Sequence, residues 1–101
     1  MKNNSDNSIE IADPFARRLM AQYLERRRAD LTDLRKALAD GDFAAIAVAG
    51  HNMYGSGAAY GLERVSEIGA DLERAADTQA ADRIGPLLDR LEQVVNEIRV
   101  A

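Results

Sequence analysis

The chain has 101 residues, 47% of them hydrophobic and 30% charged, which suits one domain with a buried core. Its net charge of −4 is opposite in sign to that of general nucleic-acid binders, and 5% aromatic residues are too few for a base-stacking platform. The chain has no cysteine, which excludes disulfides and thiolate metal sites, and a single histidine excludes zinc sites built from several imidazoles. We therefore expect no nucleic-acid partner and no bound metal.

The first twelve residues carry no helical pattern and predict a flexible tail over residues 1–12, followed by one folded domain over residues 13–101. The polar start lacks the apolar segment of a secretory signal, so we expect a cytoplasmic protein, and the initial Met1 favours a free-standing one. Residues 43–61 are uncharged, but their Gly, Asn and His residues favour a buried helix over a membrane span.

Four amphipathic segments follow in chain order. Asp13 and Asp42 are typical N-cap residues, and Gly41 and Gly61 are suited to the left-handed conformation that ends a helix. The last segment contains Pro86, so its helix starts either near that proline or earlier with a kink, and we favour the earlier start. The predicted helices span residues 14–39, 42–60, 62–77 and 79–99.

The short connections make successive helices antiparallel neighbours. No segment alternates with period two, so no strand is expected. The predicted fold is all-α, an antiparallel up-down-up-down four-helix bundle. Its core should include the apolar positions of all four stripes: Leu24, Leu31, Leu34, Leu38, Ile46, Met53, Val65, Leu72, Leu88, Leu91 and Val95.

The single histidine, His51, lies on the side of its helix that faces away from this core. On a wheel of about 100° per residue, the apolar stripe lies opposite His51. An ordinary solvent face would carry charged residues, whereas small or uncharged ones surround the imidazole. This favours a docking face with a reactive imidazole at its centre over a merely exposed histidine. The surrounding residues are Ala44, Ala47, Val48, Tyr54, Gly55 and Ala58.

Two glycines near the centre of this helix each cost about 1 kcal/mol relative to alanine. Gly57 could serve helix packing. Gly55 lies on the histidine side, where close approach of a partner is the better explanation.

Residues 51–61, followed by the apolar stripe from Leu62 to the pair at 72–73, resemble the histidine-containing phosphotransfer (HPt) domain of two-component relays. The matching features are the histidine, the glycine four residues on, the glycine that ends the helix and the Leu-Glu pair. The resemblance implies that His51 accepts a phosphoryl group from a receiver-domain aspartyl phosphate and passes it to another receiver. It also implies receiver domains or a hybrid histidine kinase as partners, and a monomeric carrier that needs no cofactor because the receiver supplies Mg²⁺.

The sequence departs from the family pattern at one position, where Tyr54 replaces the usual lysine three residues after the histidine. Tyrosine is uncharged near pH 7, so another cation would have to neutralise the phosphoryl oxygens. If the first two helices form a tight hairpin, residue 27 stands level with Tyr54, so Arg27 or Arg28 could supply that charge. The alternative is that these arginines form a solvated face with their stems against apolar surface.

Two other functions stay open. A docking-only adaptor of the same fold would bind receivers or kinases without phosphorylation of His51, and Tyr54 is the residue that argues for it. An oligomerisation module would need a second apolar stripe, whereas the outer faces of the third and fourth helices are charged. A metal-dependent bundle enzyme would need paired Glu-x-x-His motifs, which one histidine cannot supply.

Overall fold

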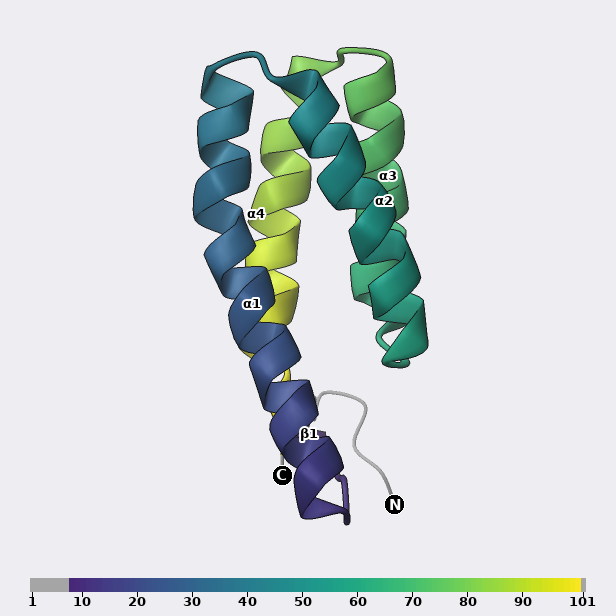
Figure 1. The fold of residues 1–101 in the computed structure, drawn as a ribbon. Coiled ribbons are helices and arrows are strands. Elements are labelled where there is room, and N and C mark those ends of the chain that lie inside the picture. The colour runs from purple at the N-terminus through teal and green to yellow at the C-terminus, as the bar shows by residue number, and fades with distance from the viewer. Residues whose placement is uncertain (1–7, 101) are drawn as a thin grey trace.

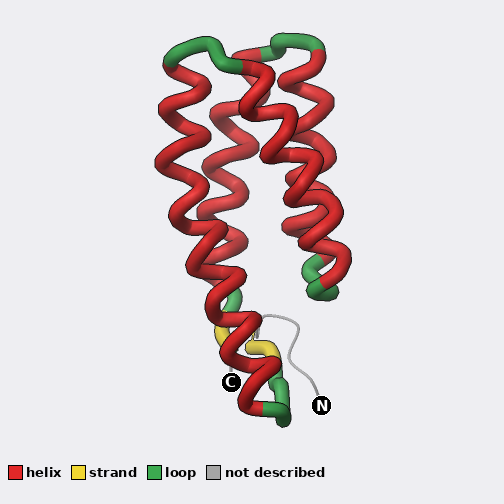
Figure 2. The backbone as a smooth tube through the Cα atoms, viewed as in Figure 1, coloured by secondary structure: helices red, strands yellow, loops and turns green. Residues whose placement is uncertain are grey.

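The computed structural model describes residues 8–100, which form four α-helices and one pair of very short strands (Figures 1 and 2). Successive helices run antiparallel, which confirms the predicted all-α up-down-up-down bundle. Each helix begins and ends within two residues of its predicted bounds. The helices are α1 (Pro14–Ala39), α2 (Phe43–Ala59), α3 (Glu63–Asp77) and α4 (Ala81–Glu97).

The predicted N-cap residues begin the first two helices. The Asp13 carboxylate accepts a hydrogen bond of 3.1 Å from the backbone N–H of Phe15, and Asp42 accepts one of 3.1 Å from that of Ala45. Both satisfy backbone donors that the first helical turn leaves unpaired. Gly41 has a φ of +70°, a conformation that strains other residues, and this lets α2 begin directly after α1 ends.

The core lies along the bundle axis and draws on all four helices. Ten of the eleven predicted core residues are buried, and Leu38 is only partly so. Pro86 lies inside α4, which agrees with the earlier start of that helix. The complete set of buried apolar residues is Met20, Tyr23, Leu24, Leu31, Leu34, Ile46, Met53, Leu62, Val65, Ile68, Leu72, Ala75, Ala76, Ile84, Leu88, Leu91, Val94 and Val95.

Three glycines let α2 and α3 approach closely. A Cβ on Gly50 would lie 2.7 Å from the backbone nitrogen of Glu73, and one on Gly57 would lie 2.6 Å from that of Ser66. On the opposite helix, a Cβ on Gly69 would lie 2.5 Å from the backbone nitrogen of Tyr54. Real side chains do not tolerate such distances, so these positions require glycine. The sequence indicated a packing role only for Gly57.

A short strand pair at the chain ends was not expected. Helix α4 ends at Glu97 rather than at residue 99, and β2 (Arg99–Val100) pairs in parallel with β1 (Ser8–Ile9). The β-branched residues at both ends favour this extended pairing. The expected absence of strands is therefore wrong, although the pair lies beyond the helices and leaves the bundle unchanged.

The expected tail over residues 1–12 falls partly outside the described residues, which begin at Ser8. Ile9 and Ile11 are partly buried against the core, together with Ile98 and Val100 near the other end of the chain. The segment just before α1 therefore packs on the bundle.

Candidate functional site

His51 lies in the middle of α2, and 69% of its side chain is exposed. The side opposite His51 is the buried one, because Ile46, Met53 and Gly57 face the core and α3. The prediction of a mid-helix histidine turned to solvent is confirmed. Both a phosphoryl group and a partner protein can reach the imidazole.

A carboxylate from α3 orients the imidazole. The Nδ1 atom of His51 lies 3.3 Å from Oε1 of Glu73, whose side chain is 35% exposed. When Nδ1 carries the proton it donates to this carboxylate, and the lone pair of Nε2 then points away as the nucleophile. From the sequence we expected that no buried carboxylate would be needed to orient the imidazole, and that at most a water or a hydroxyl would do so; the carboxylate found there, Glu73, is only partly buried. In the sequence, the only indication of a role for Glu73 is that it belongs to the Leu-Glu pair of the family resemblance.

The surface around His51 is flat and carries little charge, as predicted. Val48 and Tyr54 are 62% and 51% exposed, and a shallow hollow beside the imidazole is lined by Ala47, Val48, His51, Asn52 and Glu73. Of the expected docking residues, Ala44, Val48 and Ala58 are exposed and Ala47 is half-buried.

Gly55 lies on this open side. A Cβ added there would meet no atom within 4 Å, so packing does not require glycine at this position. The neighbouring residue, Tyr54, does contact α3: its backbone carbonyl accepts a 2.8 Å hydrogen bond from the Ser66 hydroxyl.

Arg27 lies in the seam between α1 and α2, as its register predicted, but its contacts are not with His51 or Tyr54. Its guanidinium lies 4.6 Å from the centre of the Tyr23 ring, pairs with Asp30 at 2.9 Å and donates a long 3.4 Å hydrogen bond to the Ser56 hydroxyl. Burial raises the pKa of Asp30 above its ordinary value, and the charge of Arg27 opposes that rise.

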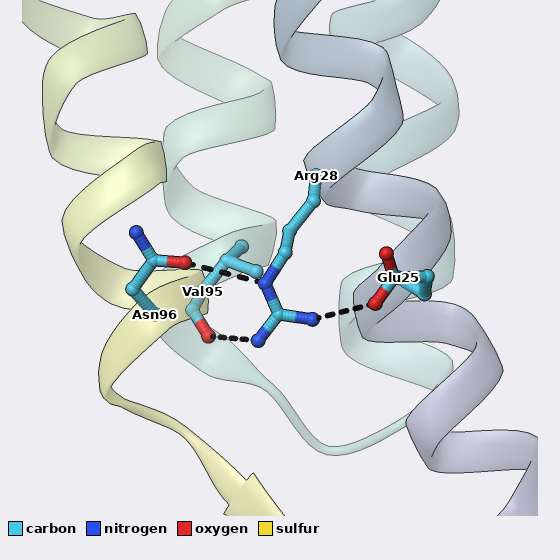
Figure 3. A network of polar contacts seen from close by, with 4 residues as sticks. All are labelled: Glu25, Arg28, Val95 and Asn96. Atoms are coloured by element: carbon cyan, nitrogen blue, oxygen red, sulfur yellow. Dashed lines mark hydrogen bonds and ion pairs between the residues drawn. The ribbon is translucent and has the colours of Figure 1, made fainter.

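Arg28 points to α4 rather than to the histidine face (Figure 3). Its Nε donates to Oδ1 of Asn96 at 3.2 Å and its Nη2 to the carbonyl of Val95 at 3.4 Å, while Nη1 pairs with Glu25 at 3.1 Å. Neighbouring residues of a helix differ by about 100° in direction, so Arg27 and Arg28 cannot both face α2. The expectation that Arg28 neighbours the phosphoryl group is wrong.

The described residues contain no group of three or more His, Cys, Asp and Glu side chains that could hold a metal ion. Within residues 8–100, none of the helices combines the length and apolar character needed to cross a bilayer.

Comparison with protein families gives a match over most of the chain. The family model described as "Hpt domain" matches residues 18–101, which is most of the chain and includes His51, Tyr54, Gly55 and Glu73. Searches of curated proteins and of solved structures found no significant match.

Proposed function

The chain belongs to the Hpt domain family, and from this membership we propose that His51 carries a phosphoryl group from the aspartyl phosphate of one receiver domain to another. Phosphorelay signalling is the setting that the family implies. The observation that carries the proposal is the exposed imidazole of His51 with its Nδ1 against Glu73, on an open face of small residues.

The proposed transfer uses this geometry. The Nε2 lone pair of His51 attacks the phosphorus of the aspartyl phosphate, and an N–P bond forms as the bond between phosphorus and the aspartate oxygen breaks. The electron pair of that bond returns to the aspartate carboxylate. The proton on Nδ1 stays in place, and Glu73 stabilises the positive charge that the ring acquires. The next receiver reverses these steps.

The remaining chemistry belongs to the partner. The receiver would supply Mg²⁺ and the groups that stabilise the transferring phosphoryl oxygens, so the bundle needs no cofactor of its own. Its contribution is to hold the imidazole at a position that a receiver can approach in line. We propose a monomeric cytoplasmic carrier whose partners are response-regulator receivers and a hybrid histidine kinase.

A docking-only adaptor is the second candidate, and one observation favours it. The usual lysine is Tyr54, and the two arginines considered as substitutes make their contacts elsewhere, Arg27 with Ser56 and Arg28 with Asn96. A phosphoryl group on His51 would then lack a neighbouring cation. In this alternative the same surface binds receivers, and His51 stays unmodified.

Incubation with a panel of phosphorylated receiver domains separates the two functions. The carrier predicts loss of phosphate from at least one receiver and its appearance on the wild-type chain but not on a His51→Gln variant. The adaptor predicts that a receiver binds both proteins equally and transfers phosphate to neither.

A further inference from the structure

The large exposed hydrophobic side chains gather on one side of the described bundle. Among the described residues, the large hydrophobic side chains that are exposed belong to α1, α2 and the residue that caps α2, and none belongs to α3 or α4. They are Phe15, Leu19, Val48, Tyr54 and Tyr60. In Figure 1, α1 passes in front of α4 and α2 in front of α3, so these side chains belong to the layer that carries His51.

Part of this apolar surface lies on an extension of α1. Helix α2 ends at Ala59, whereas α1 continues past that level toward its own N-terminus (Figure 1). Phe15 and Leu19, on this extension, are 62% and 39% exposed. Phe15 and Leu19 are four residues apart, so they lie side by side on the helix, and adjacent exposed apolar side chains suit an interaction surface better than scattered ones do.

The extension is joined to α2 by fixed contacts. Leu19 lies one turn before Tyr23, whose ring stacks on that of Tyr60 with 4.3 Å between the ring centres. The Tyr23 hydroxyl lies 2.8 Å from the Ser56 hydroxyl of α2. We call the exposed side chains Phe15, Leu19 and Tyr60 the α1 patch; Tyr60 belongs to this contact between α1 and the end of α2, and Leu19 lies one turn from it.

Two exposed cations accompany the α1 patch. On a helical wheel Phe15, Leu19 and Arg26 lie within about 40° of one another, and Arg18 flanks Phe15 by about 60°. Both arginines are exposed, and within residues 8–100 neither forms an ion pair. The chain as a whole carries a charge of −4, so this local positive charge stands out.

We propose that a receiver domain docked at His51 extends over the α1 patch, with Phe15, Leu19 and Tyr60 as apolar anchors and with Arg18 and Arg26 facing its acidic surface. This inference rests on the proposed function. The positive charge that Tyr54 fails to supply beside the histidine is then supplied at the edge of the interface. There it steers and selects the partner rather than holding the phosphoryl group.

The dimensions allow a single partner to cover both places. The register of the hairpin puts His51 level with residue 30 of α1, so Phe15 and Leu19 lie about 17–23 Å from it along the helix axis, at 1.5 Å per residue, and Tyr60 lies about 14 Å from it. An ordinary interface of about 800 Å² per partner is roughly 30 Å across. A second copy of this chain fits less well, because a symmetric contact through the α1 patch would bring the positively charged arginines of both copies together.

The test measures receiver binding separately from phosphotransfer. The probe is the receiver domain that transfers fastest to the wild-type chain or, if none transfers, the one that binds it most tightly. Phe15→Ser with Leu19→Ser should weaken its binding by about tenfold, as for the anchors of other interfaces, and Phe15→Leu should retain it. Both changed side chains are exposed, so the fold should persist, which circular dichroism checks.

Charge reversal provides a matched pair of variants. Arg18→Glu with Arg26→Glu should slow association by about tenfold at low salt and less at high salt. Arg83→Glu with Arg90→Glu makes the same change on α4, where both arginines are exposed, and should alter association by less than about twofold. All variants should still accept phosphate on His51 from phosphoramidate, a small donor that needs no docking.

Three outcomes would overturn the inference. One is receiver binding that both pairs of changes on α1 leave intact. Another is an equal loss from the α4 control, which would indicate only net charge. The third is a wild-type dimer that the Phe15 and Leu19 changes dissociate, which would assign the α1 patch to self-association. The proposed function fails separately, if His51 accepts phosphate from no receiver.

Discussion

The two sides of α2 use the same kind of residue for opposite reasons. Toward α3, a Cβ on Gly50 or Gly57 would lie less than 3 Å from backbone atoms, so these glycines allow two helices to pack closely. Toward solvent, Gly55 has nothing within 4 Å of its missing side chain. Glycine destabilises a helix interior wherever it stands. On the inner side, close packing offsets that cost within the fold, whereas on the outer side nothing in the structure does.

This contrast explains how a bundle can keep a rigid histidine on an open surface. The inner side fixes α2 against α3, which brings Glu73 to the imidazole of His51 at 3.3 Å. The outer side is left small and free of charge, and it is available to a partner. Packing within the molecule therefore does not explain Gly55, whereas close approach of a partner protein would.

Substitution on the inner side should have the largest effect. Gly57→Ala places a Cβ 2.6 Å from the backbone nitrogen of Ser66, so the helices must separate. We expect the free energy of unfolding to fall by about 1–3 kcal/mol, the range for overpacked cores, despite the better helix propensity of alanine. Urea unfolding followed by circular dichroism measures this loss. A gain in stability would contradict the close-packing account.

The same chemistry on the outer side should have the opposite sign. Gly55→Gln should leave stability unchanged or raise it by up to about 1 kcal/mol, because glycine is the poorer helix former. It should nevertheless slow phosphotransfer from a receiver by blocking approach to His51, while phosphorylation by a small donor stays normal. Unaltered transfer from the receiver would mean that Gly55 does not serve close approach.

The missing lysine can be restored. A lysine at position 54 lies near a phosphoryl group on His51, and an exposed pair of this kind contributes about 0.3–1 kcal/mol. Tyr54→Lys should therefore raise the phosphorylated fraction at equilibrium with a receiver. Arg27→Ala and Arg28→Ala should leave it unchanged, because these side chains contact Ser56 and Asn96. A lower fraction in either alanine variant would show that the arginine reaches the phosphate.

The smallest expected effect is a pH dependence in the seam between α1 and α2. Burial raises the pKa of Asp30, so the folded state binds its proton more tightly than the unfolded state. The unfolding free energy should therefore fall slightly as pH rises from the ordinary aspartate pKa through the raised one. Asp30→Asn should remove this slope, whereas Asp33→Asn should only reduce it, because the charge of Asp33 contributes to the rise in the pKa of Asp30. Identical slopes in both variants would contradict the assignment.

The sequence predicted what depends on each helix alone. Caps at Asp13 and Asp42 and the apolar periodicity located the helices, and the wheel placed His51 opposite the buried Ile46 and Met53. These properties follow from local spacing, which a single segment carries.

Relations between helices were harder to predict. The contact between His51 and Glu73 joins residues 22 positions apart, and it depends on how deeply α3 packs against α2. Gly50 and Gly69 allow the close distance between the two helices, and this distance is known only once both helix backbones are placed. The direction of Arg28 likewise depends on where α4 lies, which the pattern of α1 does not specify.

The central claim is that Nε2 of His51 is the atom that carries phosphate while Nδ1 stays protonated against Glu73. Nitrogen-15 and phosphorus-31 NMR of the chain phosphorylated by a receiver tests it most directly. The account predicts a phosphorus–nitrogen coupling to Nε2, a protonated Nδ1 and no such signal in His51→Gln. Phosphate bonded to Nδ1, or to any other residue while His51 stays unmodified, would contradict it.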